Sequence, residues 1–175
     1  MIDYTQSFMK LLQASGDALQ WAVQQVPGEQ VYTVSQRRPE SWSVARNILH
    51  VQYYEEHVVL PCMCLWLADE HAEGYKSEDA AQIARYKDYE TLAYDEEMTW
   101  KQAPDVETLL ERFQTFRSQQ INLLPQFAPE AWEEKRKAVW GKVTLRWVVT
   151  KTYQHTLEHI NEILKHALFG TGLRA

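Results

Sequence analysis

Cysteine, glycine and proline are scarce in this 175-residue chain, which has two cysteines, six glycines and six prolines. Only one residue separates Cys62 from Cys64, so these two cannot close a loop and are too few for a disulfide framework. The glycines and prolines fall mostly between long segments of helix-forming residues, not at the short, regular spacing of an all-β chain. This distribution favours an all-α fold.

An excess of positive charge and long apolar runs are also lacking. The 18 basic residues are scattered among 24 acidic ones and the formal net charge is -6, so no nucleic-acid-binding surface is expected. The longest apolar run, Val58 to Ala68, has 11 residues and includes Pro61, whereas a membrane-spanning helix needs roughly 20. The first residues contain Asp3 and lack the features of a secretory signal. We therefore expect a cytoplasmic protein that does not cross a membrane.

The composition, with 45% hydrophobic and 24% charged residues, suits one soluble domain spanning residues 1–175. Apolar residues recur at three- and four-residue intervals in four long segments, which predicts a four-helix bundle with an extra helical segment between the second and third bundle helices. The predicted helices are Asp3–Val26, Trp42–Ala68 (capped by Ser41 or Ser43, with a kink at Pro61), Asp79–Met98 (the extra segment), a helix from the cap Asp105 to Leu124, and Val143–Phe169.

Two histidines in the last predicted helix indicate a metal site. His155 and His159 are four residues apart, so on a helix their side chains stand about 40° apart and can reach one ion. The pair lies where the apolar face of this helix meets its polar face. A zincin-type site is excluded because Thr156 stands where that chemistry needs a glutamate. Two ordinary histidines, partly exposed or hydrogen-bonded, are the alternative.

His50, on the second predicted helix, would complete a set of three nitrogen ligands if that helix faces the last one. Three protein ligands leave coordination positions open for water or a substrate. A divalent ion held in this way can act as a Lewis acid or lower the pKa of a bound water or thiol.

Two motifs give the chain its resemblance to a known family: W-S followed by histidine at Trp42–His50, and H-x-x-x-H at His155 and His159. In these residues and in the order of its helices the sequence resembles the DinB-like (YfiT-like) superfamily. The resemblance implies an up-down-down-up four-helix bundle, a divalent metal (Zn, Ni, Fe or Mn) bound by the three matching histidines, and a homodimer. Characterised relatives include thiol S-transferases and a thiol-dependent maleylpyruvate isomerase. Because their substrates differ, the resemblance predicts the fold and the metal of this protein better than its substrate.

Three further residues are candidates for the site. Glu55 places a carboxylate on the apolar side of its helix, where it could orient a histidine or act as a general base, or instead pair with an arginine of another helix. Tyr54 and Trp42 lie close enough to His50 in the helical pattern to line a pocket that binds a cofactor or substrate.

Other polar residues fit the site less well. His57 could line it or lie on the surface, and His166 is about 16 Å along the helix axis from His155, too far to share an ion. Cys62 and Cys64 would point in nearly opposite directions on a helix, which favours buried packing over metal binding.

The leading hypothesis is a metal-dependent transferase or isomerase that acts on a small molecule with a low-molecular-weight thiol. A metal-dependent hydrolase, with water in place of the thiol, is one alternative. A non-catalytic bundle, in which the histidines bind metal for stability or simply pack, is the other.

Overall fold

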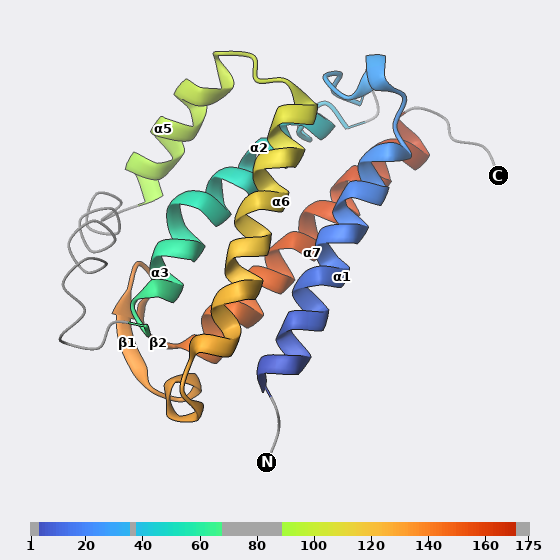
Figure 1. The fold of residues 1–175 in the computed structure, drawn as a ribbon. Coiled ribbons are helices and arrows are strands. Elements are labelled where there is room, and N and C mark those ends of the chain that lie inside the picture. The colour runs from blue at the N-terminus through green and yellow to red at the C-terminus, as the bar shows by residue number, and fades with distance from the viewer. Residues whose placement is uncertain (1–3, 36–37, 68–88, 171–175) are drawn as a thin grey trace.

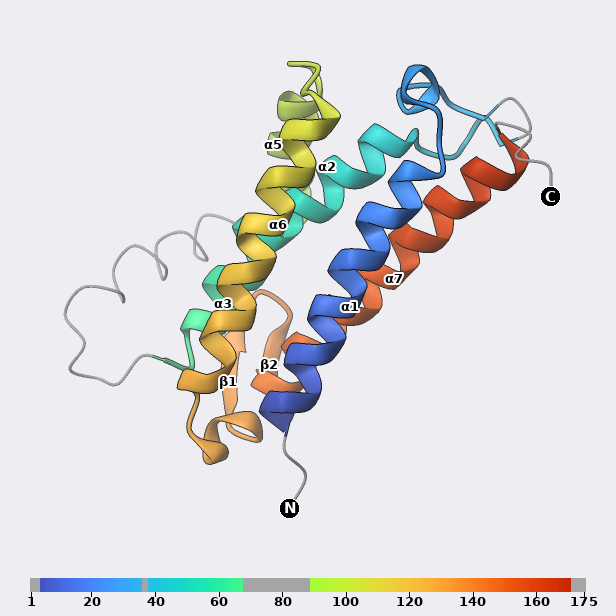
Figure 2. The ribbon, with the colours of Figure 1, turned by 45° about the vertical axis from the view of Figure 1, so that its right-hand side comes forward.

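The computed structural model describes residues 4–35, 38–67 and 89–170. Four long helical segments lie side by side, and α5 lies outside them against α2 (Figures 1 and 2). The helices are α1 (Tyr4–Gln24), α2 (Val44–Tyr54), α3 (Leu60–Cys64), α5 (Tyr89–Trp100), α6 (Val106–Leu123) and α7 (Leu145–Phe169). Short 3-10 turns cover Gly28–Gln30, Leu124–Gln126 and Pro129–Trp132. No helix in the described ranges is long and apolar enough to cross a membrane.

Three of the predicted helix boundaries are confirmed, two of them by the hydrogen bonds of the capping residues. The side chains of Ser43 and Asp105 accept hydrogen bonds from the backbone N–H groups of Arg46 and Thr108, so they cap α2 and α6. Gly170 follows the last residue of α7, as predicted.

The second predicted helix, Trp42–Ala68, is interrupted. A π-helical turn, Glu55–Val59, joins α2 to α3, and the backbone N–H of Leu60 donates to the carbonyl of Glu55. This turn comes directly before the helix that contains Pro61, so the irregularity expected at the proline is a wide turn upstream of it. Ala68 lies outside the described residues.

The chain between Asp79 and Met98 was predicted to be helical. Residues 79–88 lie outside the described part of the chain, and α5 begins at Tyr89 and extends to Trp100, two residues beyond the predicted end.

The structure agrees with the predicted all-α fold and adds one short β-hairpin, at residues 135–144, that the sequence analysis did not predict. Strands β1 (Lys135–Ala138) and β2 (Gly141–Thr144) form an antiparallel hairpin in which Lys135 faces Thr144 and Ala138 faces Gly141. Gly141 adopts a φ of 93°, which a glycine reaches without strain. The last helix consequently starts at Leu145, with Thr144 as its cap, and not at Val143.

The hairpin is fixed to the end of the second bundle segment, which consists of α2, the π-helical turn and α3. The indole nitrogen of Trp66 donates a hydrogen bond of 3.0 Å to the carbonyl of Glu134, and the guanidinium of Arg136 donates to the carbonyl of Leu65. The hairpin is thereby held beside α3 and the beginning of α7 (Figure 1).

A buried ion pair crosses the middle of the bundle. Arg117 of α6 pairs with Glu55 of the π-helical turn, and both side chains are at most 3% exposed. The same guanidinium donates to the carbonyl of Leu12 and to the hydroxyls of Ser15 and Thr156, at 2.8, 2.6 and 2.8 Å. One side chain therefore connects α6 to α1, to the second segment and to α7.

We predict that the Arg117→Met substitution lowers the free energy of unfolding by about 3–5 kcal/mol, because it leaves the Glu55 carboxylate buried without its partner. Urea unfolding followed by circular dichroism measures the change. Arg112→Met is the matched control on the same helix: the Arg112 side chain is 50% exposed in its pair with Glu56, and its loss should cost less than about 1 kcal/mol. Equal effects of the two substitutions would contradict the central role of Arg117.

Candidate metal centre

Three histidines from two facing helices meet at one point. His50 comes from α2, and His155 and His159 come from one face of α7. One nitrogen from each imidazole can be chosen so that all three lie within 4.8 Å of one another. Nitrogens bound to one tetrahedral zinc ion would be about 3.4 Å apart, so small side-chain rotations bring this set to coordination distance. The donor set therefore fits a divalent metal.

Asn47 orients His159. The amide nitrogen of Asn47 donates to the carbonyl of Ser43 at 2.9 Å, so its amide oxygen is the atom that faces His159. That oxygen lies 2.8 Å from Nδ1 of His159 and accepts its hydrogen. Nε2 of His159 is thereby left with a lone pair for a metal.

Glu96 orients His50 in the same manner. Its carboxylate lies 2.8 Å from Nδ1 of His50, and this contact holds the proton on Nδ1 and leaves Nε2 with a lone pair that a metal could bind. Glu96 is 4% exposed, and Arg46 balances its charge at 3.1 Å. Arg46 in turn lies over the rings of Trp42 and Trp100. These contacts fix α5 to α2 directly behind the histidine.

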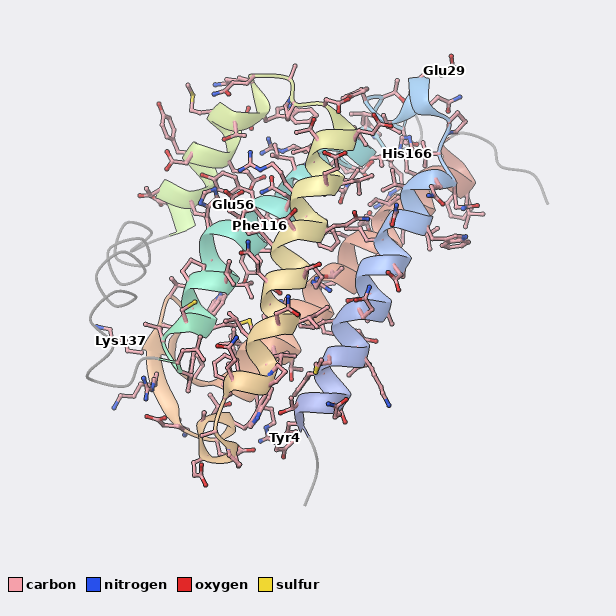
Figure 3. All side chains as sticks on the ribbon, in the orientation of Figure 1. Tyr4, Glu29, Glu56, Phe116, Lys137 and His166 are labelled. Carbon is pink, nitrogen blue, oxygen red and sulfur yellow. The ribbon has the colours of Figure 1, made fainter. Side chains whose placement is uncertain are left out.

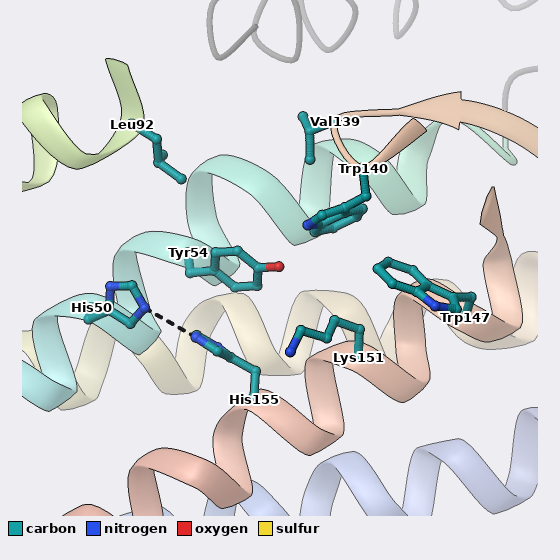
Figure 4. A pocket seen from close by; sticks show the side chains of 8 residues that line it. All are labelled: His50, Tyr54, Leu92, Val139, Trp140, Trp147, Lys151 and His155. Atoms are coloured by element: carbon teal, nitrogen blue, oxygen red, sulfur yellow. Dashed lines mark hydrogen bonds between the residues drawn. The ribbon is translucent and has the colours of Figure 1, made fainter. Parts of the chain in front are cut away.

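Nε2 of His50 lies 3.1 Å from Nε2 of His155 (Figure 4). Two such nitrogens approach this closely when a proton lies between them, and a bound cation would take the place of that proton. Burial, together with the neighbouring His159 and His50, lowers the pKa of His155 to about 2. Burial and His50 also lower the pKa of His159 to about 4. Both imidazoles are thus held neutral, the form that binds metal.

A largely apolar pocket opens beside this cluster. It has a volume of about 650 Å³, and its walls come from α2, α5, α7 and the hairpin (Figure 4). The lining residues are His50, Tyr54, Leu92, Val139, Trp140, Trp147, Lys151 and His155. Two of the three clustered histidines thus face a space large enough for a small molecule.

The predicted cofactor-binding residues lie beside the histidines. The ring of Tyr54 is 4.4 Å from that of His155, centroid to centroid, and its hydroxyl extends into the pocket (Figure 4). The ring of Trp42 is 5.0 Å from that of His50 and 6.1 Å from that of His159. Trp42 is not among the residues that line the pocket, so it covers the histidines from another side.

Glu55, the predicted catalytic candidate, lies in the core. Its carboxylate contacts Arg117, Gln120 and Thr156, and none of its hydrogen bonds in the described structure reaches an imidazole. The structure therefore favours the ion-pair interpretation of this residue over a role as base or orienter.

The remaining candidates lie outside the cluster. The ring of His57 contacts that of Tyr53, and His166 lies near the end of α7 (Figure 3). Cys62 and Cys64 are buried, as predicted, and neither forms a disulfide. Burial raises the pKa of the Cys62 thiol to about 12, which keeps it protonated and unreactive.

The sequence analysis did not identify Glu96 and Asn47 as residues of the site, and it did not predict the pocket wall that the hairpin forms with Val139 and Trp140. Asn47 precedes His50 by three residues and so shares its helix face, a signal that was present in the sequence. Glu96 belongs to the segment of 69–103 that has the least regular pattern, and its place opposite His50 depends on how α5 docks. Trp140 enters the pocket only because of the hairpin.

We predict that Glu96→Ala and Asn47→Ala each lower metal affinity about 10- to 100-fold. Each substitution removes the hydrogen bond to Nδ1 that holds one imidazole with its Nε2 toward the ion. His155→Ala should abolish tight binding and leave most of the helicity intact. Competition titration with a metal indicator measures the affinities. Glu97→Ala is the control, since Glu97 pairs with Arg46 without touching a histidine; an equal loss in this variant would remove the case for Glu96.

The metal-stripped protein should lose stability in acid. The pKa values of His155 and His159 lie below the value of 6.5 that they have without the fold, so below pH 6.5 the unfolded chain binds more protons. The free energy of unfolding therefore falls as the pH falls from 6.5 toward about 4, by at most about 1.4 kcal/mol per pH unit for each histidine. Urea titrations at several pH values should show a shallower decline for the double variant His155→Gln/His159→Gln. Parallel curves would refute this.

Comparison with known proteins places this geometry in a family. No curated protein matches the sequence. A crystal structure of a mutant of a mycothiol-dependent maleylpyruvate isomerase has a similar fold, with a TM-score of 0.53 at 13% identity, over 95% of this chain and 60% of the other. The chain thus spans less than two thirds of that protein. The family model of the DinB superfamily matches residues 11–163, and the chain therefore belongs to the DinB superfamily.

Proposed function

We propose that this protein is a metal-dependent enzyme that acts on a small electrophile and uses a low-molecular-weight thiol. It would be either a transferase that joins the thiol to the electrophile or a thiol-dependent isomerase. The observation that carries the proposal is the set of three histidines, two of them oriented through Nδ1, at the edge of an apolar pocket. The isomerase with a similar fold is named as mycothiol-dependent, which supports a thiol here as an expectation.

Some residues of the site would bind the metal ion, and others orient the residues that bind it. His50, His155 and His159 would hold a Zn, Ni, Fe or Mn ion, all of which accept imidazole ligands. A divalent ion bound there supplies the positive charge that favours the thiolate over the thiol. Asn47 and Glu96 keep the imidazoles in one orientation, and the neutral state of His155 and His159 persists well below neutral pH.

The pocket walls would exclude water from the electrophile. Tyr54, Trp140 and Trp147 present aromatic surface, and the rings of Trp140 and Trp147 lie 5.3 Å apart. The Tyr54 hydroxyl extends into the same space (Figure 4). These groups would position the acceptor beside the histidines, and holding two reactants in the right geometry lowers the barrier to their reaction.

The proposal includes three features of the whole molecule. α1 and α7 run in one direction and α2 and α6 in the opposite direction (Figure 1), which supports the up-down-down-up helix order. Exposed apolar side chains on α1 and α7, namely Trp21, Leu157, Leu168 and Phe169, offer surface for a homodimer. The cytoplasm, where thiols are kept reduced, is the proposed location.

Cobalt substitution tests the proposal. Protein purified without a histidine tag should contain about one divalent ion per chain, and the cobalt form should gain a sulfur-to-metal absorption band when cysteine, glutathione or a bacterial thiol is added. His159→Ala, which lacks one ligand, should not give the band at the same thiol concentration. Thiol consumption in the presence of electrophiles then measures turnover.

The same experiment separates the alternatives. A spectrum that does not respond to thiols, together with hydrolysis of esters or amides, would replace the proposal with a hydrolase. Loss of helicity on metal removal, with no turnover of either kind, would indicate a structural ion.

A further inference from the structure

Among the described residues that line the pocket, one ionic side chain neither orients a histidine nor belongs to the core. This is Lys151, which comes from α7 one turn before His155 and lines the pocket on the side of His155 (Figure 4). Trp140 at the tip of the hairpin and Trp147 of α7 line the same space, so Lys151 is half-buried beside aromatic surface.

The charge balance of the pocket favours an anion. Among the described residues that line it, none is a carboxylate, although acidic residues outnumber basic ones in the chain, 24 to 18. Glu96, the carboxylate behind His50, is already paired with Arg46 and His50.

Lys151 has hydrogen-bonding capacity to spare. Its ammonium donates to the amide oxygen of Gln154 at 2.8 Å, and an ammonium has three donors. The carboxylate of Glu158 is 4.0 Å away and 54% exposed, a distance and exposure at which an ion pair contributes little. A ligand anion can therefore bind Lys151 without displacing a strong partner.

We propose that Lys151 is a specificity-determining residue that binds a carboxylate group of the substrate, whose planar apolar part lies against Trp140, Trp147 and Tyr54. The substrate class is then an aromatic or unsaturated carboxylic acid that presents its reactive carbon to the histidine cluster. This inference rests on the proposed function for the reaction, but the carboxylate contact itself does not need the metal.

A matched ligand pair tests the contact. Calorimetry with 2-naphthoate and the uncharged 2-naphthamide, on zinc-loaded and on chelator-treated protein, compares a carboxylate with an amide of the same shape. We expect the carboxylate to bind about tenfold more tightly than the amide in both forms, the low end for a hydrogen bond to a charged group. In the chelator-treated protein, where no ion can bind the carboxylate, Lys151→Met should remove this preference and Lys151→Arg should keep it. Lys142→Met, at an exposed position on β2, should leave it unchanged.

Trp140→Ala supplies a second measurement that does not depend on charge. It should weaken both ligands by a similar factor, because the planar body loses a wall of the pocket. Equal binding of the two ligands to the chelator-treated wild type, or an undiminished preference in Lys151→Met, would overturn the proposal. Absence of a thiol-dependent spectrum with the carboxylate preference intact would instead refute the proposed reaction and leave this site standing.

Discussion

The buried ion pair of Arg117 and Glu55 sets how the four bundle segments align along their length. On each helix its contacts lie between two apolar groups: Ser15 between Leu12 and Leu19, Arg117 between Phe113 and Leu124. The apolar residues at one end of the bundle and those at the other form separate clusters. Sliding one helix by a turn would take a charged group away from its partner and into an apolar cluster, which is far more costly than a mismatch between apolar side chains.

The candidate metal centre depends on this alignment. Thr156, which accepts a hydrogen bond from Arg117, is the neighbour of His155, so the ion pair fixes the position of α7 along its axis where His155 and His159 emerge. The helix that bears His50 is fixed through Glu55, five residues after His50. The core and the site are therefore parts of one arrangement: the polar layer determines which residues of α2 and α7 face each other, and Asn47 and Glu96 then set the rotation of each imidazole.

Much of this could be predicted from the sequence because it follows from local periodicity. The i, i+4 spacing of His155 and His159, the caps Ser43 and Asp105, and the burial of Cys62 all depend on residues close together in the chain. What could not be predicted depends on docking. The strands of the hairpin have four residues each, too few for an alternating pattern to stand out, and Glu96 acquires its partner only when α5 packs on α2. The choice between an ion pair and a catalytic role for Glu55 likewise required knowing that Arg117 faces it.

The π-helical turn at Glu55–Val59 acts as a one-residue insertion within an otherwise continuous helix. Such an insertion turns everything after it by about 100° relative to an uninterrupted helix. A single helical wheel drawn through the segment is therefore valid only up to Tyr54, and the apolar face that carries Cys62 and Met63 has its own phase. The half that bears His50 and the half that supports the hairpin therefore present their buried residues in directions that one continuous α-helix could not combine.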